Sequence, residues 1–121
     1  MKNLLRLRLR KYSQQEIEQL VNKALEWILS ALSVIKPVKI ILIGSALGEQ
    51  FDDWSDLDFV IVFKTKEDAR AGRKALYGHR RPMPDRSIEC LCVDEATFNE
   101  KSKIGGIYFI AAEQGKILYE K

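Results

Sequence analysis

The feature that most constrains the fold is a pair of apolar runs joined through a glycine turn and two closely spaced aspartates. Residues 40–43 form the first run and end at Gly44-Ser45, whereas residues 59–63 form the second run directly after Asp56 and Asp58. Residues two apart in a strand point to the same side, so the two carboxylates converge. Backbone N–H groups at such a turn bind anions. Together these features indicate a site for Mg²⁺ and a nucleoside triphosphate.

Hydrophobic periodicity and capping residues predict the other elements. Ser13 and Glu16 form a capping box. The apolar stripe that follows them predicts a helix over 14–35 that covers a sheet face and is ended by Pro37. The remaining predictions are strands at 38–43, 56–63, 87–93 and 116–120, and helices at 46–51, 65–77, 94–103 and 104–114. No repeat or linker interrupts this series, so residues 1–121 are interpreted as a single domain.

The N-terminal residues 1–12 are basic and contain no acid. Leucine and arginine alternate strictly over residues 4–10, which is typical of a strand. Two interpretations stay open for this segment. It is either an edge strand or partner contact, or a flexible basic arm.

Composition excludes several classes of protein. The apolar fraction of 46% suffices for one packed core, and no apolar run reaches the ~20 residues that a membrane span needs. The N-terminus lacks the apolar core of a signal peptide, so we expect a soluble cytoplasmic protein. The net charge is +3, and basic residues in 1–12 and 70–86 contrast with acids at 49–58. This distribution suits an anionic substrate, although each charge also fits a solvated surface.

A third carboxylate is expected on the strand predicted at 87–93. Ile88, Cys90 and Cys92 share one face of that strand, and Glu89 stands alone on the other. A charged side chain there is costly unless it is solvated or paired, so Glu89 is the candidate. Asp85 and Asp94 are the alternatives, but they occupy turn and cap positions that favour structural roles.

The cysteines and the single histidine receive structural interpretations. Cys90 and Cys92 are too close in sequence for an unstrained disulfide, and we interpret them as buried thiols of a reducing compartment. His79 lies in a basic loop and is expected to be exposed to solvent.

The spacing of the two central motifs resembles a known family. Gly44-Ser45, ten intervening residues and Asp56-Leu57-Asp58 resemble the signature of the DNA-polymerase-beta-like nucleotidyltransferases. Ser55 and the C-terminal stretch 113–120 resemble the minimal nucleotidyltransferases of bacteria and archaea. The resemblance implies an α+β (mixed α/β) nucleotidyltransferase fold with a central mixed sheet and helices packed against it. It also implies two Mg²⁺ ions and transfer of a nucleoside monophosphate, such as AMP from ATP.

The resemblance also implies site residues and a partner. Nucleotide-binding residues are Gly44, Ser45, Gly48 and Ser55, and the catalytic and metal-binding residues are Asp56, Asp58 and Glu89. Many small members are encoded beside an all-helical HEPN protein, act as its antitoxin, and in some cases transfer AMP to a tyrosine of that protein. The chain departs from the family in three ways. It has no arginine directly after Ser45, it carries Glu rather than the commoner Asp at the third position, and we expect no second domain of the kind found in larger relatives within these 121 residues.

Other functions remain open. A binding module would keep the fold and neutralise a partner by contact alone. Modification of a small molecule such as an antibiotic is disfavoured because the acceptor domain is absent. Direct binding of nucleic acid is not favoured, and a homo-oligomer is compatible with the sequence. The three acids could also be solvated at strand ends without a catalytic role.

Overall fold

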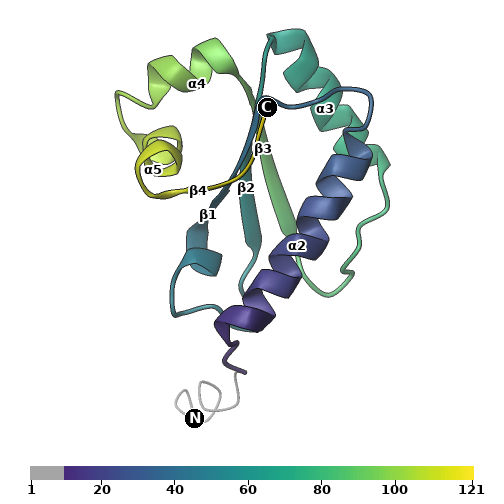
Figure 1. Cartoon of the computed structure of the whole chain (residues 1–121), viewed down its shortest axis with the longest axis vertical. Helices are drawn as coiled ribbons and strands as arrows, with labels where there is room; N and C mark the ends of the chain where they lie inside the picture. Colours follow the sequence, from purple (N-terminus) through teal and green to yellow (C-terminus); the bar gives the residue numbers. More distant parts are fainter. Residues whose placement is uncertain (1–9) are drawn as a thin grey trace.

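A four-stranded mixed sheet forms the centre of the protein (Figure 1). The structure is a computed structural model and describes residues 10–121. The strand order is β3-β2-β1-β4, with β1 at Lys39–Ile43, β2 at Leu57–Phe63, β3 at Ile88–Asp94 and β4 at Lys116–Glu120. The pair β2–β3 is parallel, and β1 pairs antiparallel with both β2 and β4. The predicted α+β fold with a central mixed sheet is therefore confirmed.

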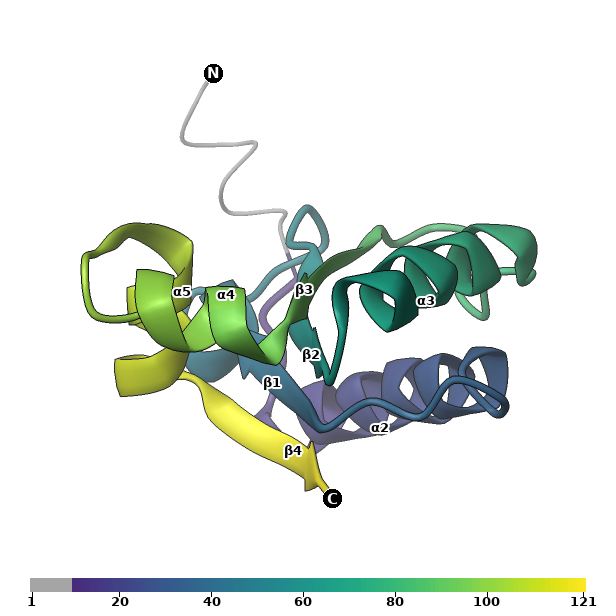
Figure 2. The same ribbon diagram turned by 90° about the horizontal axis from the view of Figure 1, so that it is seen from above.

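Helices cover both faces of this sheet (Figure 2). On one face lie α2 (Gln14–Ala31) and α3 (Lys66–Gly78). On the other lie the shorter α4 (Glu95–Lys101) and α5 (Gly106–Gln114). The side chains of Ser13, Thr65 and Asp94 accept hydrogen bonds at the starts of α2, α3 and α4, which confirms the predicted capping box at Ser13 and the cap position of Asp94.

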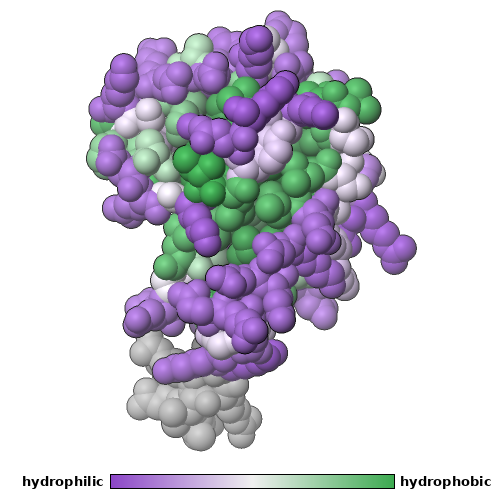
Figure 3. All heavy atoms as spheres, in the orientation of Figure 1, coloured by the Kyte–Doolittle hydropathy of each residue, from purple (hydrophilic) through white to green (hydrophobic). Residues whose placement is uncertain are grey.

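The core consists of two apolar clusters separated by the sheet. Phe59 and Phe63 of β2 pack with Ile28 of α2 in the larger cluster. Val60 of β2 and Phe98 of α4 belong to the smaller one. Strand β2 is thus apolar on both faces beyond its first residues, as a central strand requires. Apolar side chains also gather in a band across the face that carries β4 and α2 (Figure 3).

Two predicted helix bounds are wrong. Helix α2 ends at Ala31 rather than at 35, because residues 33–36 reverse the chain so that Val38 N–H can donate to Val62 O (2.7 Å). The helix predicted at 46–51 is instead a single 3-10 turn, η1, at Gly44–Leu47. Phe51 explains this difference, since its side chain is buried in the larger cluster and draws the loop inward.

The other elements lie within a few residues of their predicted bounds, and the helix predicted at 104–114 is α5. Residues 1–9 of the N-terminal stretch 1–12 are outside the described residues, so the strand or arm stays a prediction, and residues 10–12 have no regular secondary structure. None of the helices in residues 10–121 has both the length and the apolar character needed to cross a bilayer.

Candidate active site

Two of the three predicted carboxylates stand opposite each other on neighbouring strands. Asp58 of β2 is in register with Glu89 of β3 in the parallel pair. Their flanking residues, such as Phe59 and Ile88, point into the cluster under α2 and α3. Because side chains alternate along a strand, Asp58 and Glu89 share the opposite face of the sheet. Adjacent strands lie about 4.8 Å apart, so the register brings these two residues together.

Asp56 is the residue directly before β2, and its charge acts on Asp58 of this pair of carboxylates. Partial burial raises the pKa of Asp58, and the negative charges of Asp56 and Glu89 raise it further. A carboxyl whose pKa responds to both neighbours lies within reach of both charges. The structure thus places Glu89 next to Asp58 and Asp56 within electrostatic reach of Asp58, whereas the shared catalytic and metal-binding role of the three acids stays a prediction.

The glycine turn lies directly against this cluster. Gly44 follows Ile43, which is paired with Asp58 across the antiparallel β1–β2 ladder. Its φ angle is +83°, a conformation that favours glycine. A Cβ atom at this position would lie 2.7 Å from Asp58 Oδ2, so the space also excludes a side chain. The turn and the carboxylate thus form one continuous surface, as the prediction for Gly44 requires.

The other predicted nucleotide-binding residues differ in how they are placed. Ser45 is half-buried in the η1 turn, next to Gly44. Gly48 needs no glycine, because its φ is −113° and a Cβ there would meet only Ser45 O at 3.8 Å. The Ser55 hydroxyl already accepts from Asp52 N–H (3.1 Å) and donates to Asp52 Oδ1 (3.3 Å). Ser55 therefore shapes the loop before β2.

Neither alternative carboxylate joins the site. Asp94 is buried and accepts a hydrogen bond from Thr97 N–H (3.0 Å) as the cap of α4. Asp85 is exposed in the loop before β3, where it lines a hollow with Tyr12 and Met83. Glu89 is thus the third acid that the fold brings to Asp58.

The acidic loop between Gly48 and Asp56 is held by residues that the sequence did not single out. The Arg86 guanidinium donates to Asp52 O (3.1 Å) and to Ser55 O, and it lies over the Phe51 ring at 4.6 Å. It also donates to Tyr12 Oη at 3.1 Å. These contacts fix the backbone directly before Asp56.

Tyr12, which lies just before the N-cap of α2, completes this anchor. Its hydroxyl donates to Asp53 Oδ1 (2.6 Å), which raises the pKa of Tyr12 and lowers that of Asp53. The Tyr12 ring packs edge-on against Phe51, with ring centroids 5.3 Å apart. An aromatic residue inside a polar loop was the only sequence signal for this arrangement. Arg86 carried no such signal.

Replacing Arg86 by alanine should loosen the loop and cost about 1–3 kcal/mol, because a charged donor to several oxygens is lost. Thermal unfolding followed by circular dichroism measures the loss. Arg80→Ala is the matched control, since Arg80 is exposed in the same loop. Equal melting temperatures for the two variants would contradict the anchoring role.

Apolar side chains of α5 border the carboxylates. Ile107 lines a hollow together with Asp58, Glu89 and Leu91. Ile110 lines a second hollow with Gly44, where the turn faces solvent. The candidate site is therefore an open cleft with acids and a glycine turn on the sheet and an apolar wall on α5.

The donor atoms of the cleft fit a hard divalent cation. Asp56, Asp58 and Glu89 offer only carboxylate oxygens, the ligands that Mg²⁺ prefers. In residues 10–121, no three His, Cys, Asp or Glu side chains are already grouped so that they could hold a metal ion. Burial raises the pKa of Asp58, and the like charges of Asp56 and Glu89 raise it further, so a tighter group of the three carboxylates would repel itself more strongly. The carboxylate oxygens of these residues support the magnesium prediction. The three side chains would need a cation between them in order to lie closer together.

The two thiols and the histidine lie outside this chemistry. Cys90 and Cys92 are free, and burial raises their pKa values to about 12 and about 11. Neither thiol is ionised near neutral pH, which agrees with a packing role. His79 is exposed, as predicted.

Comparisons with known proteins place the chain in no family. No protein-family model matches the sequence, and neither a curated protein nor a solved structure matches the chain.

Proposed function

We propose that the chain is a Mg²⁺-dependent nucleotidyltransferase that transfers a nucleoside monophosphate, AMP from ATP, to a hydroxyl of a partner protein. In this proposal it acts in the cytoplasm as the antitoxin of a helical HEPN protein. One observation carries the proposal: Asp58 and Glu89 stand in register beside Asp56, and the Gly44 turn abuts Asp58. This arrangement combines phosphate-binding backbone with acids that fit metal ions.

The reaction is a substitution at the α-phosphorus. The acceptor hydroxyl oxygen forms a bond to this phosphorus, the bond from the phosphorus to the oxygen that bridges to the β-phosphate breaks, and pyrophosphate leaves. A carboxylate oxygen of Glu89 receives the hydroxyl proton. Mg²⁺ ions held by Asp56, Asp58 and Glu89 would neutralise charge on the phosphate oxygens. The backbone at Gly44 and Ser45 orients the triphosphate.

The exposed surface beside the cleft supports a macromolecular acceptor. Ile107 and Ile110 of α5 are each 45% exposed, and Ile104, just before that helix, is 80% exposed. Large apolar side chains gathered on a surface mark interaction sites. The same surface favours the second candidate function, a module that neutralises its partner by contact without transfer.

A labelling experiment tests transfer directly. The chain is co-expressed with the product of the neighbouring reading frame, and the purified complex is incubated with MgCl₂ and ATP labelled at the α-phosphate. We expect label on the partner, and no label when ATP carries it at the γ-phosphate. The variant Asp56→Asn with Asp58→Asn should remain folded and transfer nothing.

The control outcomes separate the two candidate functions. Full labelling by the double variant would overturn the catalytic assignment. Absence of labelling by the wild type, with neutralisation of the partner by both proteins, would favour the binding module.

A further inference from the structure

We propose that the free edge of β3 binds an extended acidic segment of the partner protein and presents a hydroxyl of that segment to the carboxylates. The segment would add to the sheet as a strand, with acidic side chains on one face and a tyrosine, serine or threonine on the other. This inference rests on the proposed function, since it names the class of acceptor that the same site would receive.

Strand β3 offers unpaired backbone groups to such a segment. It lies at the end of the sheet and, among the strands of residues 10–121, pairs with β2 alone. Ser87 O accepts from Leu57 N–H, which shows that the peptide groups of odd-numbered residues face β2. Cys92 O is instead reached from outside by the Arg73 guanidinium (3.1 Å). By alternation, the N–H and C=O groups of Cys90 face outward and can pair with another strand.

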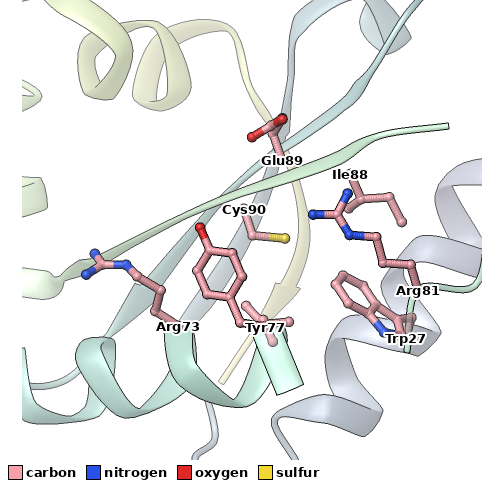
Figure 4. A pocket seen from close by; sticks show the side chains of 8 residues that line it. Trp27, Arg73, Tyr77, Arg81, Ile88, Glu89 and Cys90 are labelled. Atoms are coloured by element: carbon pink, nitrogen blue, oxygen red, sulfur yellow. The ribbon is translucent and has the colours of Figure 1, made fainter. Parts of the chain in front are cut away.

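Positive charge lies beside this edge on the side of α3. Arg73 and Arg81 line a small hollow over Cys90, and Tyr77, 79% exposed, stands between them (Figure 4). In the described part of the chain, neither guanidinium forms an ion pair with a carboxylate. Helical spacing puts Lys66 and Arg70 on the same side of α3 as Arg73. An acidic segment would therefore be attracted to this edge.

The two faces of an added strand would meet different chemistry. Arg81 and Tyr77 point toward Cys90, whereas Glu89 projects away from them (Figure 4). Side chains of a paired strand alternate between the faces of the sheet. Acids on one face would therefore lie over the arginines, and the residue between two acids would lie on the face that carries Glu89 and Asp58. The geometry selects a pattern of acid, hydroxyl and acid.

Peptide pairing accounts for more of these observations than a nucleic acid does. A phosphate backbone would use the arginines and could stack a base on Tyr77, but it would leave the outward peptide groups of Cys90 without partners. A peptide strand satisfies both the charges and the edge. Tighter binding of a nucleic acid than of a peptide is therefore one of the results that the experiment distinguishes.

Fluorescence anisotropy with the full chain tests the proposal. The probe is a fluorescein-labelled nine-residue peptide in which glutamate alternates with tyrosine or threonine. We expect binding that weakens with salt. We expect the double variant Arg73→Glu, Arg81→Glu to bind the peptide at least tenfold more weakly than the wild type. The single variant Arg81→Glu keeps the hydrogen bond from Arg73 to Cys92 O, and we expect it to show a smaller loss of affinity. Arg80→Glu is the matched control, because Arg80 does not line the hollow.

Two altered probes check the mode of binding. A peptide with lysine in place of glutamate should prefer the double arginine variant over the wild type. N-methylation of alternate backbone nitrogens should abolish binding, because it blocks pairing with the edge. Two results would overturn the proposal. One is equal affinity of the wild type and Arg81→Glu for the acidic peptide, and the other is tighter binding of a single-stranded oligonucleotide of nine nucleotides than of this peptide.

Performing these measurements in the Asp56→Asn, Asp58→Asn variant separates this inference from the proposed function. Peptide binding without transfer in the wild type would overturn only the catalytic function. If the wild type transfers label to a partner, and the Arg73 and Arg81 variants bind and label that partner equally well, only the edge-strand inference is overturned.

Discussion

Asp58→Asn is expected to raise the melting temperature at pH 7 by about 2–5 °C while lowering nucleotidyl transfer by about 10³-fold or more. Partial burial and the charges of Asp56 and Glu89 raise the pKa of Asp58, so its ionised form destabilises the fold. The amide removes this charge at similar size and also removes a ligand of the proposed metal site. In the proposed function, the carboxylate at this position would therefore be kept at the expense of stability. Differential scanning calorimetry and the labelling assay measure the two effects.

The sign of the pH dependence follows from the raised pKa. The folded state binds a proton at Asp58 at a higher pH than the unfolded state does, so the penalty exists above the folded pKa and disappears as the pH falls through it. The stabilisation by Asp58→Asn should therefore be largest at neutral pH and shrink in acid. Glu18→Gln, at an exposed position of α2, is the control. A melting temperature at pH 7 that is unchanged or lower in Asp58→Asn would contradict this account.

Gly72→Ala is expected to destabilise the fold by about 1–3 kcal/mol, or roughly 5–10 °C in melting temperature. Gly72 lies where α3 packs on β2, and a Cβ atom there would lie 2.3 Å from Phe63 Cζ. The Phe63 side chain is fully buried, so a shift of its ring would disturb the packing of the larger cluster. The overpacking outweighs the gain in helix propensity, which is about 1 kcal/mol for glycine to alanine.

The same helix supplies a matched control. Gly78 lies at the end of α3, and a Cβ atom there would have nothing within 4 Å. Gly78→Ala should therefore leave the melting temperature near that of the wild type. Adding Phe63→Leu to Gly72→Ala should recover part of the loss, because it removes the ring atom that the new methyl group meets. Equal stability of Gly72→Ala and Gly78→Ala would show that α3 shifts without cost.

The sequence was informative wherever a short-range rule decides the structure. Alternation along a strand predicted that Asp56 and Asp58 share one side of their strand and that Glu89 lies opposite the core residues of its own, and the caps placed the starts of three helices. The register between β2 and β3 is a long-range property, so the sequence could predict that Glu89 shares this face but not that it stands opposite Asp58.

Long-range packing explains what the sequence did not predict. The loop after η1 is not helical, because Phe51 packs into a core built from α2 and the sheet. The Arg86 anchor joins residues 12, 51–55 and 86, which no local pattern relates. Gly48 matched the family pattern, yet its backbone conformation and surroundings admit any side chain.

The strand order has a consequence for how long the cleft persists. Asp58 belongs to a central strand, whereas Glu89 belongs to an edge strand that can open while the rest of the sheet stays closed. Each local opening of β3 would disassemble the acidic cluster without unfolding the core. A ligand that bridges Asp58 and Glu89 would hold the edge strand β3 against the central strand β2. Hydrogen exchange at the amides of β3 would then slow when substrate binds.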